Sequence, residues 1–122
     1  IPLGEITITA TSKRMFSSRE CNIPLAGYRE RGLQQVVICG IETHVCVLQT
    51  ALDLLSDGWQ VCIVVDATGS RAQRDQEIAF ARMASESVVL ATTESVLFEW
   101  CETSTAPEFR IISSLVKEVC PE

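Results

Sequence analysis

Residues 36 to 46 read Val36-Val37-Ile38-Cys39-Gly40-Ile41-Glu42-Thr43-His44-Val45-Cys46, and the expected fold is built outward from them. The apolar run at 36–39 predicts a strand covered on both faces, which is typical of a parallel sheet flanked by helices. Gly40 opens a turn. Thr43 is the expected N-cap of the next helix, because its hydroxyl can accept from a backbone N–H two or three residues on. Cys46 then lies in the first helical turn, where the positive end of the helix dipole favours a thiolate.

The amino-terminal side of this turn shows a strand pattern and then a helix pattern. Alternating apolar and polar residues predict a strand over Gly4–Thr11, followed by a polar segment that holds Lys13. A short helix is expected over Pro24–Arg31, with Asn22 as its cap and Gly32 as the residue that ends it.

The carboxyl-terminal side continues the alternation. The expected elements are a helix over 43–56, a strand over 59–65, a helix over 73–85, a strand over 88–91, a helix over 93–101 capped by Thr93, and a last helix opened by Pro107. The last helix has a one-sided apolar face, typical of a core or subunit contact, made of Phe109, Ile112, Leu115 and Val119. Repeated strand-helix-strand order implies right-handed crossovers and a parallel sheet. The predicted fold class is therefore α/β, a three-layer α/β/α Rossmann-like sandwich with a mainly parallel sheet.

Length and charge restrict the domain organisation and the partners. The 122 residues suit a single domain, 1–122. Because the chain starts at Ile1 and its first methionine is Met15, we expect that domain to be incomplete at the amino terminus. The net charge of −6 argues against a nucleic-acid partner. No apolar run has the length of a membrane span, so we expect no membrane partner.

Cysteine usage bears on metals and on the cellular compartment. The six cysteines include no C-x-x-C pair, and there is one histidine, so the sequence supports neither a zinc site nor a redox pair, and no cofactor is expected. Cys39 and Cys62 lie in apolar strand patterns, where cysteine usually acts as a small buried hydrophobe. A reducing, cytoplasmic setting is the resulting prediction.

Three chemistry-bearing residues are expected at one edge of the sheet. Ligands of open parallel sheets bind outside the carboxyl ends of the strands, and Lys13, Cys46 and Asp66 all fall there. Lys13 can pair with a thiolate or an oxyanion, and backbone N–H groups at Val45 and Cys46 could hold an oxyanion. His44 is a poor partner for Cys46, because side chains two residues apart on a helix point to different sides.

Structural interpretations of the same residues remain open. From spacing alone, the commoner role of a cysteine such as Cys46 is a packed core thiol, and that of Lys13 a solvated loop residue. Asp66 and Arg71 could simply cap and solvate the loop after their strand. Glu42, as a polar residue in a strand-to-helix turn, needs no function.

Two runs, Leu25–Gly32 and Val36–Val47, closely resemble the isochorismatase-like cysteine hydrolases. The likeness continues through 50–55, Gly58, 65–67 and 70–71, and Lys13 with Phe16-Ser17 resembles the family's lysine segment. It covers most of residues 13 to 100, with G-I-E-T-H-V-C at 40–46 as its specific part, and is strongest to the eukaryotic isochorismatase domain-containing subgroup.

The resemblance implies roles for individual residues. Cys46 would be the nucleophile and Lys13 the lysine of a catalytic triad, with a cis peptide at Ile41-Glu42. The residues implied in the oxyanion site or in substrate binding are Val45, Glu42, Ile41, Thr43 and Phe16. The family's third triad member is an aspartate at the end of a first strand, whereas the earliest aspartate in this sequence is Asp53.

These expectations lead to two functions. The first is a cysteine-dependent hydrolase of a small amide or related C–N bond, acting on a small-molecule substrate through an acyl-Cys46 intermediate. The alternative is a non-catalytic binding or scaffold protein that keeps the fold and a degenerate site. A nucleotide-binding flavodoxin-like domain is disfavoured, because the sequence has no phosphate-cradling loop. A homo-oligomer is expected from the resemblance and from the apolar last helix.

Overall fold

The computed structural model describes residues 11–119 and shows an α/β fold around a parallel sheet. Within these residues the sheet has three strands in the order β1-β2-β3: β1 (Gln35–Ile41), β2 (Gln60–Gly69) and β3 (Val89–Ala91). Both neighbouring pairs are parallel, which confirms the predicted fold class. The strand expected over Gly4–Thr11 falls almost entirely on residues 4–10, outside the described part of the chain.

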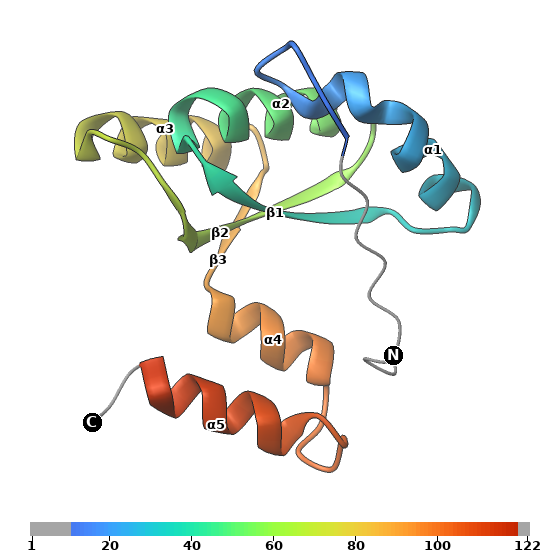
Figure 1. The fold of residues 1–122 in the computed structure, drawn as a ribbon, viewed down its shortest axis with the longest axis vertical. Helices are drawn as coiled ribbons and strands as arrows, with labels where there is room; N and C mark the ends of the chain where they lie inside the picture. Colours follow the sequence, from blue (N-terminus) through green and yellow to red (C-terminus); the bar gives the residue numbers. More distant parts are fainter. Residues whose placement is uncertain (1–10, 120–122) are drawn as a thin grey trace.

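The helices lie on both sides of the sheet. In chain order they are η1 (Ser18–Cys21, a 3-10 helix), α1 (Asn22–Glu30), η2 (Thr43–Val47, a π-helix), α2 (Leu48–Ser56), α3 (Gln73–Ser85), α4 (Thr93–Cys101) and α5 (Phe109–Val119). Figure 1 shows α1, α2 and α3 on one side of the strands and the α4–α5 pair on the other. Along residues 11–119, none of the helices combines the length and the apolar character needed to cross a membrane.

The main core lies between the sheet and the helices α2 and α3. Its buried side chains come from η2, α2, β2 and α3 and from the residues just before β2 and β3. They are Val47, Leu48, Ala51, Leu54, Trp59, Val61, Ile63, Ala79, Met83 and Val88. This packing fixes the carboxyl end of β1 and the start of the following helix relative to α3.

The strand β1 is buried on one face only, so the prediction of a strand covered on both faces is wrong. Val36 and Ile38 are half-buried, whereas Val37 and Cys39 are exposed. Successive side chains of a strand point to opposite faces, and in the described part of the chain the helices α1 and α2 cover only the face that carries Val36 and Ile38. Cys39 is therefore an exposed thiol and not the buried hydrophobe expected from its sequence.

Several helix boundaries differ from the predictions by one or two residues. The first helix begins at Asn22 itself, with Cys21 at the N-cap position. The cap of α4 is Thr92, not Thr93: its extended backbone lets its hydroxyl accept from the Ser95 N–H while the Ser95 hydroxyl accepts from the Thr92 N–H. The last helix begins at Phe109, two residues after Pro107.

Candidate functional site

The turn that carries Cys46 joins the end of β1 to α2. Gly40 has φ +126°, a value that residues with a Cβ rarely adopt, so the glycine permits the chain to leave the strand here. The Ile41-Glu42 peptide bond is cis, as the resemblance implied. Thr43–Val47 then forms a π-helical turn, a feature often found at functional sites, that runs directly into α2. Cys46 lies inside this turn.

Main-chain bonds, not a side-chain cap, close this turn. The Glu42 carbonyl accepts from the N–H groups of Val45 at 3.1 Å and Val47 at 3.2 Å. The Thr43 side chain is fully buried, and its hydroxyl has no hydrogen-bond partner within residues 11–119. The prediction that Thr43 caps the helix is therefore wrong, because its hydroxyl points into the interior while Glu42 takes the position before the first turn.

Cys46 and Lys13 line the same pocket, which has a volume of about 170 Å³. The remaining lining residues come from β1, its following turn, the start of α2 and the Lys13 segment: Ser18, Ile38, Cys39, Gly40, Ile41, Val47 and Thr50. Thr50 is not among the predicted site residues, although it lies four residues after Cys46 and so on the same helix face. The edge of the sheet thus brings a thiol and an ammonium group to one small, open hollow.

The Lys13 segment is folded over the start of α2. The Lys13 Nζ donates to the carbonyl oxygens of Met15 at 2.9 Å and Phe16 at 2.6 Å. The backbone of the same loop thus accepts two of the hydrogen bonds that the ammonium can donate. The Ser18 N–H donates to Thr50 Oγ1 at 2.9 Å, which ties the segment to α2. The Phe16 side chain is 62% exposed and is not one of the lining residues of the pocket.

His44 points away from Cys46, as the two-residue spacing predicts. Its Nδ1 lies 2.9 Å from the Ser70 Oγ and 3.8 Å from a Glu42 carboxylate oxygen, and its Nε2 lies 3.8 Å from Asp75 Oδ2. Arg71 is more than a solvating residue, because its Nε pairs with the Glu42 Oε1 at 2.9 Å. Sequence analysis found no signal for the His44–Ser70 contact, which joins residues from two different elements.

Asp66 binds the first residue of α4 and does not line the pocket. Its Oδ1 accepts from the Thr93 N–H at 2.8 Å and from the Thr93 hydroxyl at 3.0 Å. The hydrogen bond from the Thr93 backbone holds the pKa of the Asp66 carboxyl below its usual range. Asp66 therefore does not cap a loop after its own strand: β2 continues past it to Gly69, and its carboxylate joins β2 to the start of α4.

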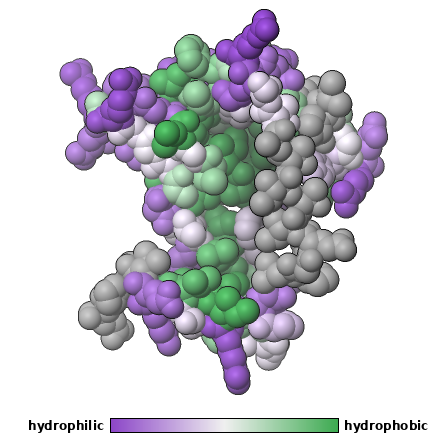
Figure 2. All heavy atoms as spheres, viewed as in Figure 1, coloured by the Kyte–Doolittle hydropathy of each residue, from purple (hydrophilic) through white to green (hydrophobic). Residues whose placement is uncertain are grey.

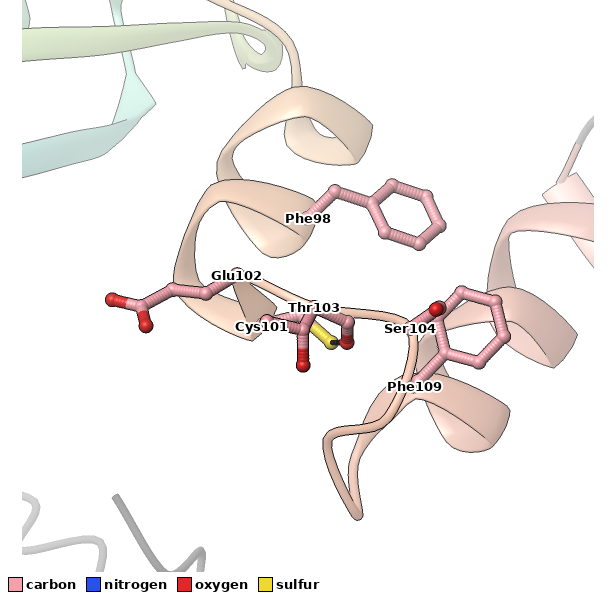
Figure 3. Close-up of a pocket in the computed structure, with 6 residues that line it drawn as sticks. All are labelled: Phe98, Cys101, Glu102, Thr103, Ser104 and Phe109. Atoms are coloured by element: carbon pink, nitrogen blue, oxygen red, sulfur yellow. Dashed lines mark hydrogen bonds between the residues drawn. The ribbon is translucent and has the colours of Figure 1, made fainter.

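A second hollow, of about 150 Å³, lies between α4 and α5 (Figure 3). The rings of Phe98 and Phe109 lie 6.3 Å apart on one side of it, at an angle of 51°. The Cys101 thiol donates to the Thr103 carbonyl at 3.4 Å, so its hydrogen-bonding capacity is used locally. This hollow reflects the packing of the two helices, and the candidate site remains the Cys46 pocket.

No metal centre is found in the part of the chain that the structure describes. Among residues 11–119, no three His, Cys, Asp or Glu side chains lie close enough together to hold a metal ion.

Comparison with known proteins places these features in a family. The family model for the isochorismatase domain matches residues 4–95. Isochorismatase domain-containing protein 2A from Mus musculus is 47% identical over 90 residues, which cover 74% of this chain and 44% of that protein. The chain thus spans less than half the length of this curated relative.

Solved structures show the same fold. The MAR1 ribonuclease from Caenorhabditis elegans matches with a TM-score of 0.76 at 36% identity, over 90% of this chain and 56% of that one. The nicotinamidase from Staphylococcus aureus matches with a TM-score of 0.59 at 27% identity, over 65% of this chain and 51% of that one. The structural relatives therefore include hydrolases. Since the family model covers most of the sequence, the chain belongs to the isochorismatase family.

Proposed function

We propose that this protein is a cysteine-dependent hydrolase of a small amide or a related C–N bond, with Cys46 as the nucleophile. The observation that carries the proposal is the shared pocket of Cys46 and Lys13 at the carboxyl end of β1. A thiol at the start of a helix experiences the positive end of the dipole, and a nearby ammonium adds to that field. The named hydrolases among the structural relatives support the reaction class.

The proposed reaction has two steps. The Cys46 thiol gives up its proton, the thiolate attacks the carbonyl carbon of the amide, and the C–N bond breaks as the nitrogen takes up that proton and leaves as an amine or ammonia. A water molecule then attacks the acyl-Cys46 thioester, which releases a carboxylic acid and restores the thiol. The Lys13 ammonium stabilises the thiolate in this scheme.

The turn that carries Cys46, residues 42–47, is called the nucleophile turn below. Its backbone supplies the oxyanion donor. The Val45 N–H already donates to the Glu42 carbonyl, so the proposal gives this role first to the Cys46 N–H. Ile41 lines the pocket and is the proposed apolar contact for the substrate. Three other predicted substrate contacts have less support, because none of them lines the pocket. Glu42 pairs with Arg71, Thr43 is fully buried, and Phe16 is exposed.

The proton acceptor is not assigned to a residue between 11 and 119. Asp53 comes from the middle of α2, 3.9 Å from the Arg19 guanidinium, and is not a lining residue of the pocket. The Glu20 carboxylate accepts from the main-chain N–H groups of Arg14 and Met15. Its hydrogen bonds are thus made within its own segment, and it does not line the pocket.

Cysteine-resolved alkylation tests the nucleophile. The protein is treated with iodoacetamide at mild pH, and the rate at each cysteine is measured by peptide mass spectrometry. We expect Cys46 to react fastest, ahead of Cys39, which is exposed and lines the same pocket. Equal rates at Cys46 and the other five thiols would contradict the proposal.

Turnover and trapping test the reaction. We expect hydrolysis of at least one amide in a panel that includes nicotinamide, and a covalent acyl adduct at Cys46 by mass spectrometry. Cys46→Ala should abolish both. A reactive Cys46 in a protein that turns over nothing in the panel would favour the alternative, a binding protein that keeps the pocket.

Lysine variants test the role of the ammonium. We expect Lys13→Met to slow alkylation of Cys46 by about two- to fivefold, the range of a single partly screened charge pair, and Lys13→Arg to keep most of the rate. Arg14→Met is the matched control, because Arg14 is exposed, neighbours Lys13 in sequence and does not line the pocket.

RNA hydrolysis is the competing substrate class, because the Caenorhabditis elegans relative carries the name ribonuclease. The net charge of −6 does not favour binding of a phosphate backbone. The panel therefore includes single-stranded RNA, and Cys46-dependent cleavage of RNA without amide turnover would replace the amide proposal.

A further inference from the structure

A cluster of polar side chains joins the turn that carries Cys46 to the chain between β2 and α3, and none of its residues lines the pocket. His44 from the turn contacts the Ser70 hydroxyl at 2.9 Å, in the segment that follows β2. Asp75, in the first turn of α3, lies 3.8 Å from the other ring nitrogen of His44. The His44 side chain is 22% exposed, so this contact is partly shielded from water.

Glu42 gives the turn a second attachment to the same segment. Its carboxylate pairs with the Arg71 Nε at 2.9 Å and accepts from the Arg71 main-chain N–H at 3.3 Å. The Glu42 side chain is 24% exposed, whereas the Arg71 side chain is 85% exposed. Two side chains of the turn are therefore held by the chain between β2 and α3.

Two other kinds of contact also hold the turn. The buried side chains of Thr43 and Val47 pack it into the core, and the Glu42 carbonyl accepts from the N–H groups of Val45 and Val47. The Thr43 hydroxyl has no hydrogen-bond partner among the described residues, so it adds no directed restraint. The side chains of His44 and Glu42 therefore supply the polar contacts between the turn and the chain that joins β2 to α3.

We infer that His44 is a positioning residue that holds the nucleophile turn through Ser70 and so directs Cys46 into the pocket. The inference rests on the proposed function of Cys46. Residues two apart on a helix point to different sides, so fixing His44 against Ser70 and Asp75 fixes Cys46 on the pocket side. His44 acts through the turn and takes no proton from Cys46. The Glu42–Arg71 pair provides a second attachment of the turn. The contacts of His44 with Ser70 and of Glu42 with Arg71 are together called the clamp below.

Two measurements on the full-length protein and its variants test the clamp. The first is the ratio of iodoacetamide alkylation rates at Cys46 and Cys39, which share the pocket and so share any change in its access. We expect His44→Ala and Ser70→Ala to lower this ratio about threefold or more, the effect of one lost hydrogen bond. His44→Asn should restore it, because the Asn amide can occupy the position of the ring Nδ1.

The second readout is hydrogen exchange of the amides in residues 43–47. We expect exchange to be faster in His44→Ala and Ser70→Ala and near the wild-type rate in His44→Asn. Gln73→Ala is the matched control, because it removes an exposed bond to Glu77 on the same α3 without touching the turn. This control should leave both readouts unchanged.

The outcomes separate the clamp from the proposed function. If wild-type Cys46 reacts no faster than Cys39, the proposed function fails, while the exchange of residues 43–47 still tests the clamp. Unchanged exchange in His44→Ala and Ser70→Ala would overturn the clamp. Faster exchange with an unchanged alkylation ratio would also overturn it, since His44 would then stabilise the turn without positioning the thiol. Failure of His44→Asn to rescue would exclude the Ser70 bond as the cause.

Discussion

The Ser18 N–H and the Thr50 Oγ1, 2.9 Å apart, join the segment that carries Lys13 to the helix that follows Cys46. Both residues line the pocket, and Thr50 is only 6% exposed. This hydrogen bond, with the ion pairs of Arg19 to Asp53 and Asp57, holds the Lys13 segment against α2.

Thr50→Val should loosen the Lys13 segment. The substitution keeps the shape of the side chain but leaves the Ser18 N–H without its acceptor, so we expect the free energy of unfolding to fall by about 1–2 kcal/mol. Urea denaturation measures this loss. Thr105→Val, at an exposed threonine whose hydroxyl bonds only to Thr103, should cost less. Equal losses in the two variants would show that the Ser18–Thr50 bond does not hold the segment.

Asp66 should stabilise the protein in a pH-dependent way. Because its pKa is lowered in the folded state, its contribution is present above the ordinary carboxyl pKa of about 3.9 and is lost as the pH falls through the folded value. Near neutral pH we expect Asp66→Ala to cost about 0.5–1 kcal/mol, the range for hydrogen bonds lost at an exposed site. The difference from wild type, measured by urea unfolding at several pH values, should shrink in acid. A pH-independent difference would contradict this assignment.

Cys62 should be the slow counterpart of Cys46 in alkylation experiments. Burial raises the pKa of the Cys62 thiol, and the negative charge of Glu99 adds to this effect. We expect its alkylation rate to increase only at alkaline pH, and Glu99→Gln to shift that increase modestly toward lower pH. Mass spectrometry of the Cys62 peptide measures both effects. An unchanged pH profile in Glu99→Gln would exclude the electrostatic contribution.

Homo-oligomer formation stays a prediction, and exposed apolar side chains support it. Trp100, Ile111 and Leu115 are 66%, 57% and 49% exposed, and Figure 2 shows apolar side chains gathered over the sheet and over α4–α5. We expect Leu115→Glu to reduce the sedimentation coefficient at micromolar concentration. Lys117→Glu on the same helix should not. A monomeric wild-type protein under these conditions would contradict the prediction of a homo-oligomer.

The helix patterns were predicted well where the apolar period is long. The helix over Gln73–Ser85 has the predicted bounds, and the helix over 43–56 is found as η2 and α2 together. These elements follow from the side-chain period, which is contained in a short window of sequence. The caps were predicted less well, because Thr92 and Thr93 both have the required hydroxyl and only the backbone angles distinguish them.

The exposure of β1 could not be predicted from its composition. An apolar run such as 36–39 indicates a strand, but its burial depends on which helices pack over each face. In the described residues Val36 and Ile38 face α1 and α2, while Cys39 faces outward and lines the pocket.

The order of strands and helices along the chain and the turn at Gly40 follow from local sequence, because each depends on neighbours a few residues away. The shared pocket of Lys13 and Cys46 depends on packing between distant segments. The contacts that hold the nucleophile turn also depend on such packing. His44 meets Ser70 across 26 positions of sequence, and Glu42 meets Arg71 across 29, because α3 packs beside the start of α2. Such contacts are set by how whole elements pack against one another, and no short window of residues contains that information.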